Sequence, residues 1–500
     1  MLFNSTVFLM LFLPLALAGW YLLGKCRRPV WSRLFLVGMS LWFYGYYNVS
    51  YLWIMVCSLT VNYLISAGME RFSEKCFGSP RFGKNGKFTA GKLLLGTGLF
   101  CNLGLLFYFK YFHFFIDNCN FFLHTDIWVE KIALPLGISF FTFQQISYLM
   151  DRYRKTAPHY GVVDYSCFIT FFPQLVAGPI VLHQEFMPQL QASHGRKWSK
   201  EQFLNGAELF ILGLAKKVLL ADVLALIVNA EYQNLAYLDM LTAWITIICY
   251  MLELYFDFSG YCDMARGLGK MFGFELPENF RSPLLAVSVK DFWRRWHITL
   301  SRFFMQYVYV PLGGNKKGKR RQCLNLLVVF AASGLWHGAN WTFVVWGLLH
   351  GLAEIWETCF PKLRFRKEWM NRVTTAVFVT LSFSVFRSES LSDAVLLWKK
   401  LFTGGNTGLF LGLCNTLQVP ETYAVRKVLE LAAPQFLNPV YAGSLCVLLG
   451  ISLRLICGKR AEQWLERNGK TTRGIFVLAT LFVWAFLSLS QVSTFLYFNF

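Results

Sequence analysis

Apolar residues in this chain gather into long continuous runs rather than into the narrow stripes of soluble helices. A helical run of about 20 residues is long enough to cross the hydrocarbon core of a bilayer. The pattern therefore predicts membrane-spanning helices over the following ranges: 5–24, 33–48, 50–69, 93–112, 132–150, 203–230, 239–259, 323–337, 341–358, 372–387, 438–456 and 474–494.

Two further apolar segments, 160–183 and 405–418, are interrupted by glycine and proline. Irregular backbone is tolerated at membrane depth only where protein or a cavity surrounds it. We therefore expect both segments to be re-entrant or to pack in a protein-lined cavity. Residues 173–179 (P-Q-L-V-A-G-P) in particular indicate non-helical backbone in or near the membrane.

Composition agrees with a membrane protein. The 500 residues are 55% hydrophobic and 18% aromatic, but only 15% charged, which is less charge than a soluble protein carries. No Pro/Gly/Ser linker or low-complexity tract divides the chain. We therefore expect an all-α polytopic fold with about 11–12 transmembrane helices, plus re-entrant and interfacial helices, in one membrane-embedded domain (1–500).

The formal charge of +20 indicates membrane topology rather than nucleic-acid binding, because the basic residues lie mostly in short loops between apolar runs. Region 260–321 holds twelve Lys or Arg against four Asp or Glu. The positive-inside rule places this region, 71–92 and 454–473 in the cytoplasm. It places the N-terminus and residues 497–500 outside. Since basic residues follow the run 5–24, we expect a retained span rather than a cleaved signal peptide.

Several common chemistries find no support. The 13 cysteines are scattered, without C-x-x-C pairs or Cys/His ligand spacing, so we predict neither structural disulfides nor a metal site. There is no G-x-S-x-G of a serine hydrolase and no Walker-type phosphate loop. No internal repeat appears, which disfavours transporter folds built from duplicated halves.

Residues 287–304 are too charged to span a membrane but have a helical period. With about 100° per residue, one side collects Trp293, Trp296, His297, Leu300, Phe303 and Phe304, and the other collects Arg294, Arg295 and Arg302. This pattern predicts an amphipathic helix at the membrane surface, capped by Ser288 with Asp291 three residues on. His297, at the edge of the apolar face, is either a hydrogen-bonded structural histidine or a functional one.

A glycine turn and a basic run follow, with Gly313 and Gly314 permitting a tight turn. The cations are Lys316, Lys317, Lys319, Arg320 and Arg321. They are candidates for binding the phosphates of an anionic donor such as coenzyme A. The alternative is a topology signal that also contacts anionic lipid headgroups.

His337 lies near the centre of an almost wholly apolar run, 326–351. An ionisable group at such depth is costly and indicates function. The alternative is a hydrogen bond to a neighbouring helix, which we favour for His350 near the end of the run. A helix break at 338–340 would leave His337 at a helix end; a continuous helix would place Trp341 one turn beyond it. The spacing of Gly334 and Gly338 lets another backbone approach.

Histidine suits acyl transfer to a hydroxyl, since imidazole can accept and return the hydroxyl proton near neutral pH. Other polar residues in apolar context are Asp257 and Ser259, which either orient a histidine, line a tunnel or cap a helix end. Lys217 either snorkels or pairs with Asp222.

Taken together, these segments resemble the membrane-bound O-acyltransferase (MBOAT) family, in particular its bacterial alginate O-acetyltransferase branch. The resemblance runs nearly the full length. It rests on the following residues: 173–180 (PQLVAGPI), 255–261 (YFDFSGY), 277–280 (PENF), 291–297 (DFWRRWH), 309–314 (YVPLGG), 334–341 (GLWHGANW) and 495–500 (FLYFNF).

The resemblance implies that His337 is the principal catalytic histidine and His297 the second characteristic one, in a core of approximately 165–358. It implies a ring of tilted helices around a thinned centre, with a central tunnel where a cytoplasmic funnel and an outer cavity meet at His337. On this interpretation the candidate tunnel residues are Asp257, Ser259, Trp336, Asn340 and Trp341.

The function implied is transfer of an acetyl group from a cytoplasmic thioester, acetyl-CoA or another acyl thioester, towards an alginate-like cell-surface polysaccharide. The expected partners are the bilayer, the donor and an extracytoplasmic SGNH-type acetyltransferase. No permanently bound cofactor is expected, and the location is a bacterial cytoplasmic membrane. The alternatives are peptidoglycan O-acetylation, teichoic-acid D-alanylation, or a transporter or scaffold of a polysaccharide export complex.

Overall fold

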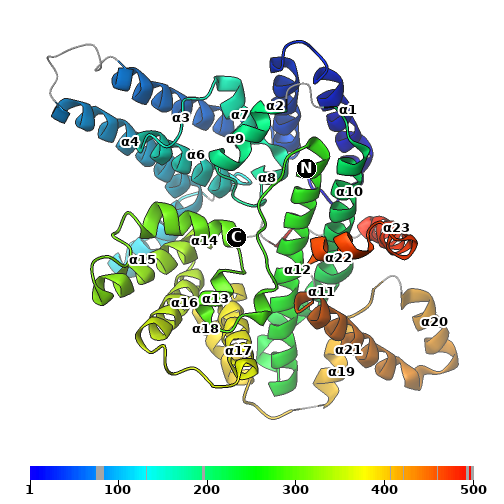
Figure 1. The fold of residues 1–500 in the computed structure, drawn as a ribbon. Helices are drawn as coiled ribbons and strands as arrows, with labels where there is room; N and C mark the ends of the chain where they lie inside the picture. Colours follow the sequence, from blue (N-terminus) through cyan, green and yellow to red (C-terminus); the bar gives the residue numbers. More distant parts are fainter. Residues whose placement is uncertain are drawn as a thin grey trace. The chain divides into compact units, whose positions relative to one another are not determined.

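The computed structural model describes residues 1–74, 84–130, 132–193, 197–405, 407–419, 422–458, 460–490 and 495–496. These residues form helices and loops without a β-strand, as the apolar pattern predicts (Figure 1). The basic loop residues 75–83 and the terminal residues 497–500, used in the predicted topology, lie outside this description. The membrane orientation remains a prediction.

The chain divides into two compact units that interleave along the sequence. Unit 1 comprises Met1–Phe210, Met264–Glu278 and Arg302–Pro311. Unit 2 comprises Ile211–Asp263, Asn279–Ser301 and Leu312–Phe500. The predicted single domain stays a prediction, and each unit is described by itself.

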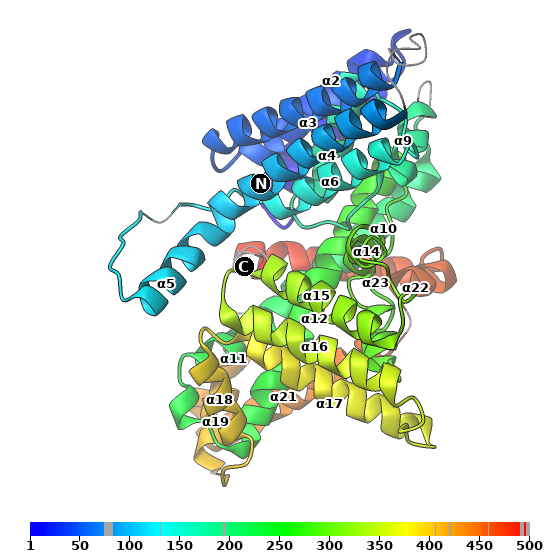
Figure 2. The same cartoon turned by 90° about the vertical axis from the view of Figure 1, so that its left-hand side faces the viewer.

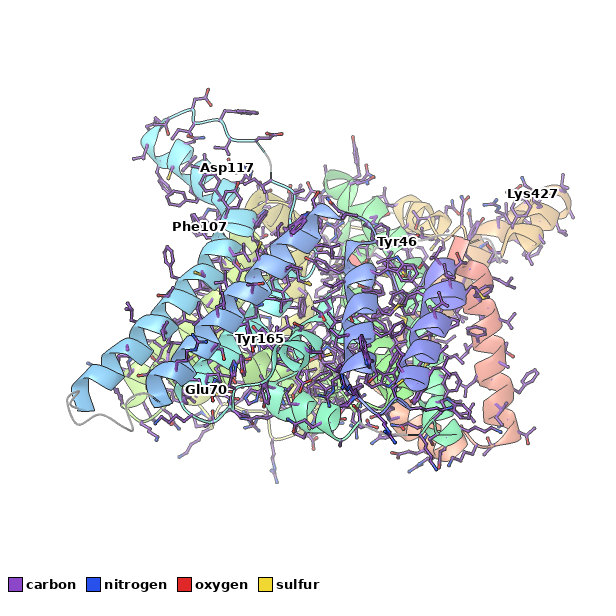
Figure 3. The ribbon with its side chains drawn as sticks, turned by 90° about the horizontal axis from the view of Figure 1, so that it is seen from above. Tyr46, Glu70, Phe107, Asp117, Tyr165 and Lys427 are labelled. Carbon is purple, nitrogen blue, oxygen red and sulfur yellow. The ribbon has the colours of Figure 1, made fainter. Side chains whose placement is uncertain are left out.

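Unit 1 begins with helices that match the predicted apolar runs. They are η1 (Phe8–Phe12), α1 (Leu13–Leu23), α2 (Val30–Gly45), α3 (Ser50–Glu74), α4 (Lys84–Leu106), η2 (Phe107–Tyr111), α5 (Phe112–Leu123) and α6 (Ile138–Tyr153). The span predicted for 93–112 is too short, because α4, η2 and α5 continue one another. Figure 3 labels Phe107 and Asp117 along this continuous helix. The helix closes at His124, whose backbone is left-handed.

The segment 160–183 is broken, as its glycine and prolines predict. It forms α7 (Val162–Thr170) and the single turn α8 (Phe172–Leu175), and α9 (His183–Gln191) follows. Phe172 packs edge-on against Phe12, with ring centroids 5.1 Å apart. Phe171, Leu175 and Val181 are fully buried as well, so the irregular backbone is enclosed by protein, as predicted.

Unit 2 carries the remaining helices. They are the end of α10 (Lys200–Ala215), η3 (Lys216–Ala221), α11 (Asp222–Tyr232), η4 (Leu235–Tyr237), the first part of α12 (Met240–Phe272), η5 (Pro283–Leu285), α13 (Val289–Trp293), the start of α14 (Ile298–Phe304), α15 (Lys319–His337), α16 (Trp341–Cys359), α17 (Glu368–Arg387), α18 (Leu391–Lys400), α19 (Thr407–Asn415), α20 (Tyr423–Ala432), η8 (Pro434–Phe436), α21 (Leu437–Ile456), α22 (Ala461–Asn468), α23 (Thr472–Leu487) and η9 (Ser488–Ser490). The end of α14 and η6 (Met305–Tyr309) belong to unit 1.

By length and apolarity, four of the described helices can cross a membrane: Ser50–Arg71, Ala90–Leu123, Met240–Phe272 and Pro434–Ile456. Two shorter apolar helices, Phe8–Leu23 and Thr472–Leu487, add to these. The protein is a polytopic, all-helical membrane protein. The span predicted to end at 259 is wrong, since α12 runs on to Phe272. Lys216 Nζ lies 2.6 Å from Asp263 Oδ2, and Lys217 Nζ lies 2.5 Å from Asp257 Oδ1. These ion pairs compensate the charge of both carboxylates, so the helix can continue past them.

Helices α15 and α16 form a close antiparallel hairpin, and α15, α16 and α17 lie side by side (Figure 2). Contact is closest where Gly334 meets the backbone of α16. A Cβ added at Gly334 would collide with the carbonyl oxygen of Phe343. One added at Gly347 would collide with that of Phe330. The close approach predicted from the glycine spacing is confirmed for Gly334.

Gly334→Val is expected to force the hairpin apart and misplace the end of α15. Overpacking of this kind costs about 1–3 kcal/mol or more, because the obstacle is backbone that cannot rotate away. The thermal midpoint of the purified variant should fall markedly. Gly104→Val is the matched control, since a Cβ there meets nothing within 4 Å. Equal midpoints for the two variants would contradict the packing assignment.

Candidate active site

The helix that carries His337 ends at that residue. Gly338 is extended, and α16 begins at Trp341. Asn340 caps the new helix, because its Oδ1 accepts a hydrogen bond from the Thr342 amide at 3.1 Å. The broken helix is therefore the correct one of the two predicted alternatives. His337 lies at a carbonyl end, where the helix dipole stabilises positive charge on a ring that has taken up a proton.

Aromatic rings surround the His337 imidazole, which is buried. Ring centroids lie 4.9 Å away in Trp336, 5.2 Å away in Trp346 and 5.2 Å away in Phe386. Trp346 stands edge-on to it, with an interplanar angle of 89°. An enclosure of this kind limits the access of water and strengthens electrostatic interactions inside it.

The amphipathic helix predicted over 287–304 is wrong in its middle. The cap is confirmed, since Ser288 Oγ accepts from the Asp291 amide at 3.0 Å. However, α13 ends at Trp293, and His297 has a left-handed backbone with φ 43° before α14 begins. The non-helical residues Asn279 and Arg281 bond to backbone groups on either side of His297, which a continuous helix would use itself. The Arg281 amide donates to the Arg295 carbonyl at 2.8 Å, and the Ile298 amide donates to the Asn279 carbonyl at 3.1 Å.

The side chain of Asn279 fixes which nitrogen of His297 carries the proton. Asn279 Oδ1 accepts from the Thr299 amide and from Thr299 Oγ1, each at 3.1 Å, so this atom is an acceptor. His297 Nδ1 lies 3.2 Å from the same oxygen and must therefore donate. The lone pair of the neutral ring then lies on Nε2. Asn279 was part of a quoted motif, but the sequence assigned it no role.

His297 and His337 lie close together. Their ring centroids lie 6.5 Å apart, and Trp336 contacts both rings. Burial lowers the pKa of His297 to about 3, so this ring is neutral at physiological pH. His297 is only 1% exposed. The aromatic enclosure thus brings together two imidazoles, a combination able to accept and return a proton.

The other predicted tunnel residues are placed differently. Asp257 Oδ1 lies 2.5 Å from Lys217 Nζ, and Asp257 Oδ2 accepts from the Leu496 amide at 2.9 Å. Its carboxylate oxygens are thus bound by groups other than a histidine. Lys217 also pairs with Asp222 at 2.8 Å, as predicted. Ser259 is buried on the same helix, whereas Trp341 is 47% exposed.

The basic run lies at the opposite end of α15 from His337. The glycine turn is confirmed, because Gly313, Gly314 and Gly318 have positive φ. Asn325 Nδ2 holds the turn by donating to the Gly314 carbonyl at 2.8 Å. The five predicted cations, Lys316, Lys317, Lys319, Arg320 and Arg321, are all exposed. The 19 residues of α15 separate the run from His337 by about 27 Å at 1.5 Å per residue.

His350 is a structural histidine, as predicted. Trp293 Nε1 can only donate, and it lies 3.3 Å from His350 Nδ1. His350 Nε2 therefore carries the proton and lies 2.8 Å from Ser382 Oγ, which in turn donates to the Val379 carbonyl. Both ring nitrogens of His350 are thus hydrogen-bonded, and these bonds join α16 to α13 and α17.

The family model for MBOAT, the membrane-bound O-acyltransferase family, matches residues 127–387. A peptidoglycan O-acetyltransferase of Helicobacter pylori is 35% identical over 100% of this chain and 98% of its own length.

Two other kinds of relative cover less of the chain. A probable alginate O-acetylase AlgI of Pseudomonas aeruginosa is 35% identical over 81% of this chain and 75% of its own. A teichoic acid D-alanyltransferase of Bacillus subtilis is 27% identical over 50% of this chain and 65% of its own. The chain belongs to the membrane-bound O-acyltransferase family and is a membrane acyltransferase.

Proposed function

We propose that this acyltransferase moves an acetyl group from a cytoplasmic thioester to a hydroxyl of a cell-surface glycan, with His337 as the general base. The observation that carries the proposal is the position of His337, which ends a helix inside an aromatic enclosure beside His297. A buried histidine that ends a helix and faces a second imidazole suits proton transfer in a site closed to water.

The reaction forms one ester bond and breaks one thioester bond. The acceptor hydroxyl oxygen attacks the thioester carbonyl while His337 takes the hydroxyl proton. The carbon–sulfur bond then breaks, and the leaving thiolate takes the proton back from the imidazolium. His297, held with its lone pair on Nε2, orients a polar group in the same pocket. The donor in this proposal is acetyl-CoA, and the acceptor is presented by an extracytoplasmic SGNH-type partner.

The acceptor that the comparisons support best is peptidoglycan. The Helicobacter pylori peptidoglycan O-acetyltransferase aligns with this chain end to end, whereas the alginate O-acetylases match about four fifths of it. This changes the order predicted from sequence, which placed an alginate-like polysaccharide first. The proposed location is the cytoplasmic membrane of a bacterium, with the region 260–321 facing the cytoplasm.

The identity of the acceptor can be tested by deleting the gene for this protein in its native cell. Ester-linked acetate released by mild alkali from purified peptidoglycan should disappear and return when the wild-type protein is restored. His337→Gln should not restore it. Unchanged peptidoglycan acetate, with acetate lost from a secreted polysaccharide instead, would assign the acceptor to the alginate-like class.

The basic run is proposed to bind the donor's phosphates. No acidic side chain in the described part of the chain forms an ion pair with these five cations. Replacing all five with glutamine should raise the KM for acetyl-CoA by about tenfold or more, the equivalent of one charge-assisted hydrogen bond. The kcat should change little.

The matched control replaces the exposed cations Lys362, Arg366 and Lys367, which follow α16. It distinguishes phosphate binding by the basic run from a general effect of positive charge on the KM for acetyl-CoA. Equal KM values for both variants, with membrane topology intact, would exclude a phosphate-binding role for the run.

A further inference from the structure

A cavity of about 920 Å³ in unit 2 plays no part in the site described above. Its walls are α21 and α23, with η3 and the middle of α12. Both α21 and α23 are apolar, and the helix Pro434–Ile456 has only 22% of its apolar window buried inside the protein. One wall of the cavity is therefore a helix whose remaining surface faces lipid, which gives the bilayer access to the cavity.

The lining is apolar along almost its whole length. On α21 it extends from Val440 to Leu455. At 1.5 Å per residue this is about 22 Å, longer than the ~15 Å of one leaflet of a hydrocarbon core. Val447 and Ile451, in the middle of this stretch, are exposed side chains that only the cavity and lipid can cover. A groove of this length and character fits an acyl chain.

Charge defines one end of the cavity. Among the described residues that line it, the two charged ones are Lys216 and Arg460, and no acidic residue joins them. Lys216 is paired with Asp263 at 2.6 Å, so its charge is partly compensated. Arg460 follows the end of α21, beside Trp464 of α22. An arginine with a neighbouring indole is a combination suited to the headgroup region of a membrane.

Arg460 also belongs to the basic segment 454–473, which the sequence places at the cytoplasmic face. That leaflet is rich in anionic lipid. Ser282 Oγ donates to the Gly458 carbonyl at 3.2 Å and ties this end of the cavity to the loop before α13. The polar end of the cavity is thus a fixed part of unit 2.

We propose that this cavity is a binding site for one anionic glycerophospholipid. One acyl chain lies along α21, and the phosphate lies at Arg460 and Trp464. The inference is independent of the acyl-transfer chemistry, because neither His337 nor His297 is among the residues that line the cavity.

The test measures the phospholipid that stays with the purified protein. The protein is extracted with detergent from membranes that contain phosphatidylglycerol and phosphatidylethanolamine, washed, and analysed by mass spectrometry as a monodisperse fraction. Wild type should retain one phospholipid per chain, enriched in phosphatidylglycerol relative to the membrane. Gly443→Phe should lower this amount several-fold, because Gly443 lines the cavity and a Cβ there meets open space.

Gly450→Phe is the matched control, since Gly450 lies on the same helix with open space around it but does not line the cavity. It should retain lipid as wild type does. Val447→Trp provides a second way to fill the cavity if Gly443→Phe does not yield monodisperse protein. Arg460→Gln should keep the amount of lipid but lose the enrichment in phosphatidylglycerol. Wild-type lipid content in both cavity-filling variants, or unchanged enrichment in Arg460→Gln, would overturn the proposal.

Discussion

His337→Ala is expected to yield a folded, membrane-inserted protein whose acetyl transfer falls at least about 10²–10⁴-fold, the usual contribution of a general base. The loss should appear in kcat, because the donor's phosphates are proposed to bind at the far end of α15. The ring contacts of His337 include Trp336, Trp346 and Phe386, together with His297. Their packing should hold the pocket together without the imidazole.

The buried histidine His350 provides the contrast. Its two ring nitrogens are hydrogen-bonded to Trp293 and Ser382. His350 lies on α16, the helix that also carries Trp346 of the site. His350→Gln should lower the thermal midpoint, since a buried hydrogen-bond partner is lost. Turnover per folded molecule should stay close to that of wild type. If His337→Ala lost stability instead and kept its turnover, the roles of the two histidines would be reversed.

The second large effect is expected from Asn279, a positioning residue that acts through His297. Asn279→Leu removes the acceptor for His297 Nδ1 and for the Thr299 amide. The ring is then free to adopt the other tautomer. Loss of a group that orients a metal-binding histidine costs about 10–100-fold in affinity or activity. We expect a fall of that size in kcat here, with little change in KM.

Asn279→Asp separates orientation from simple folding. A carboxylate still accepts from both donors, so this variant should recover most of the activity lost in Asn279→Leu. The pH profile gives a further readout. Because burial holds the pKa of His297 at about 3, this ring stays neutral from pH 5 to 8, and His297→Asn should leave inflections in that range where they are in wild type. Equal activity in the Leu and Asp variants would contradict the tautomer assignment.

The pattern of apolar runs was sufficient to predict most helices and the burial of His337 within one of them. The break after His337 could be anticipated from Gly338 and Asn340, because both residue types favour the ends of helices. The close approach at Gly334 followed from glycine spacing alone. These features depend on residues that are near one another in the sequence, where local preferences decide the structure.

Features that depend on distant residues could not be predicted in this way. The helical period over 287–304 was real, yet the helix breaks because Asn279 and Arg281 bond to backbone groups near 295–299. Trp346 and Phe386 enclose His337 only after α16 and α17 have packed beside α15. Asp257 suggested a partner for a histidine, but the cation Lys217, 40 residues earlier, binds it.

The most direct test of the central claim is sided transfer in sealed vesicles that contain the purified protein. Radiolabelled acetyl-CoA is supplied on the face that carries the basic run, and the acceptor, with its SGNH-type partner, on the other. The account predicts that wild-type protein places label on acceptor hydroxyls, released as acetate by mild alkali, and that His337→Ala places none above background. Label transfer by His337→Ala at the wild-type rate would contradict it.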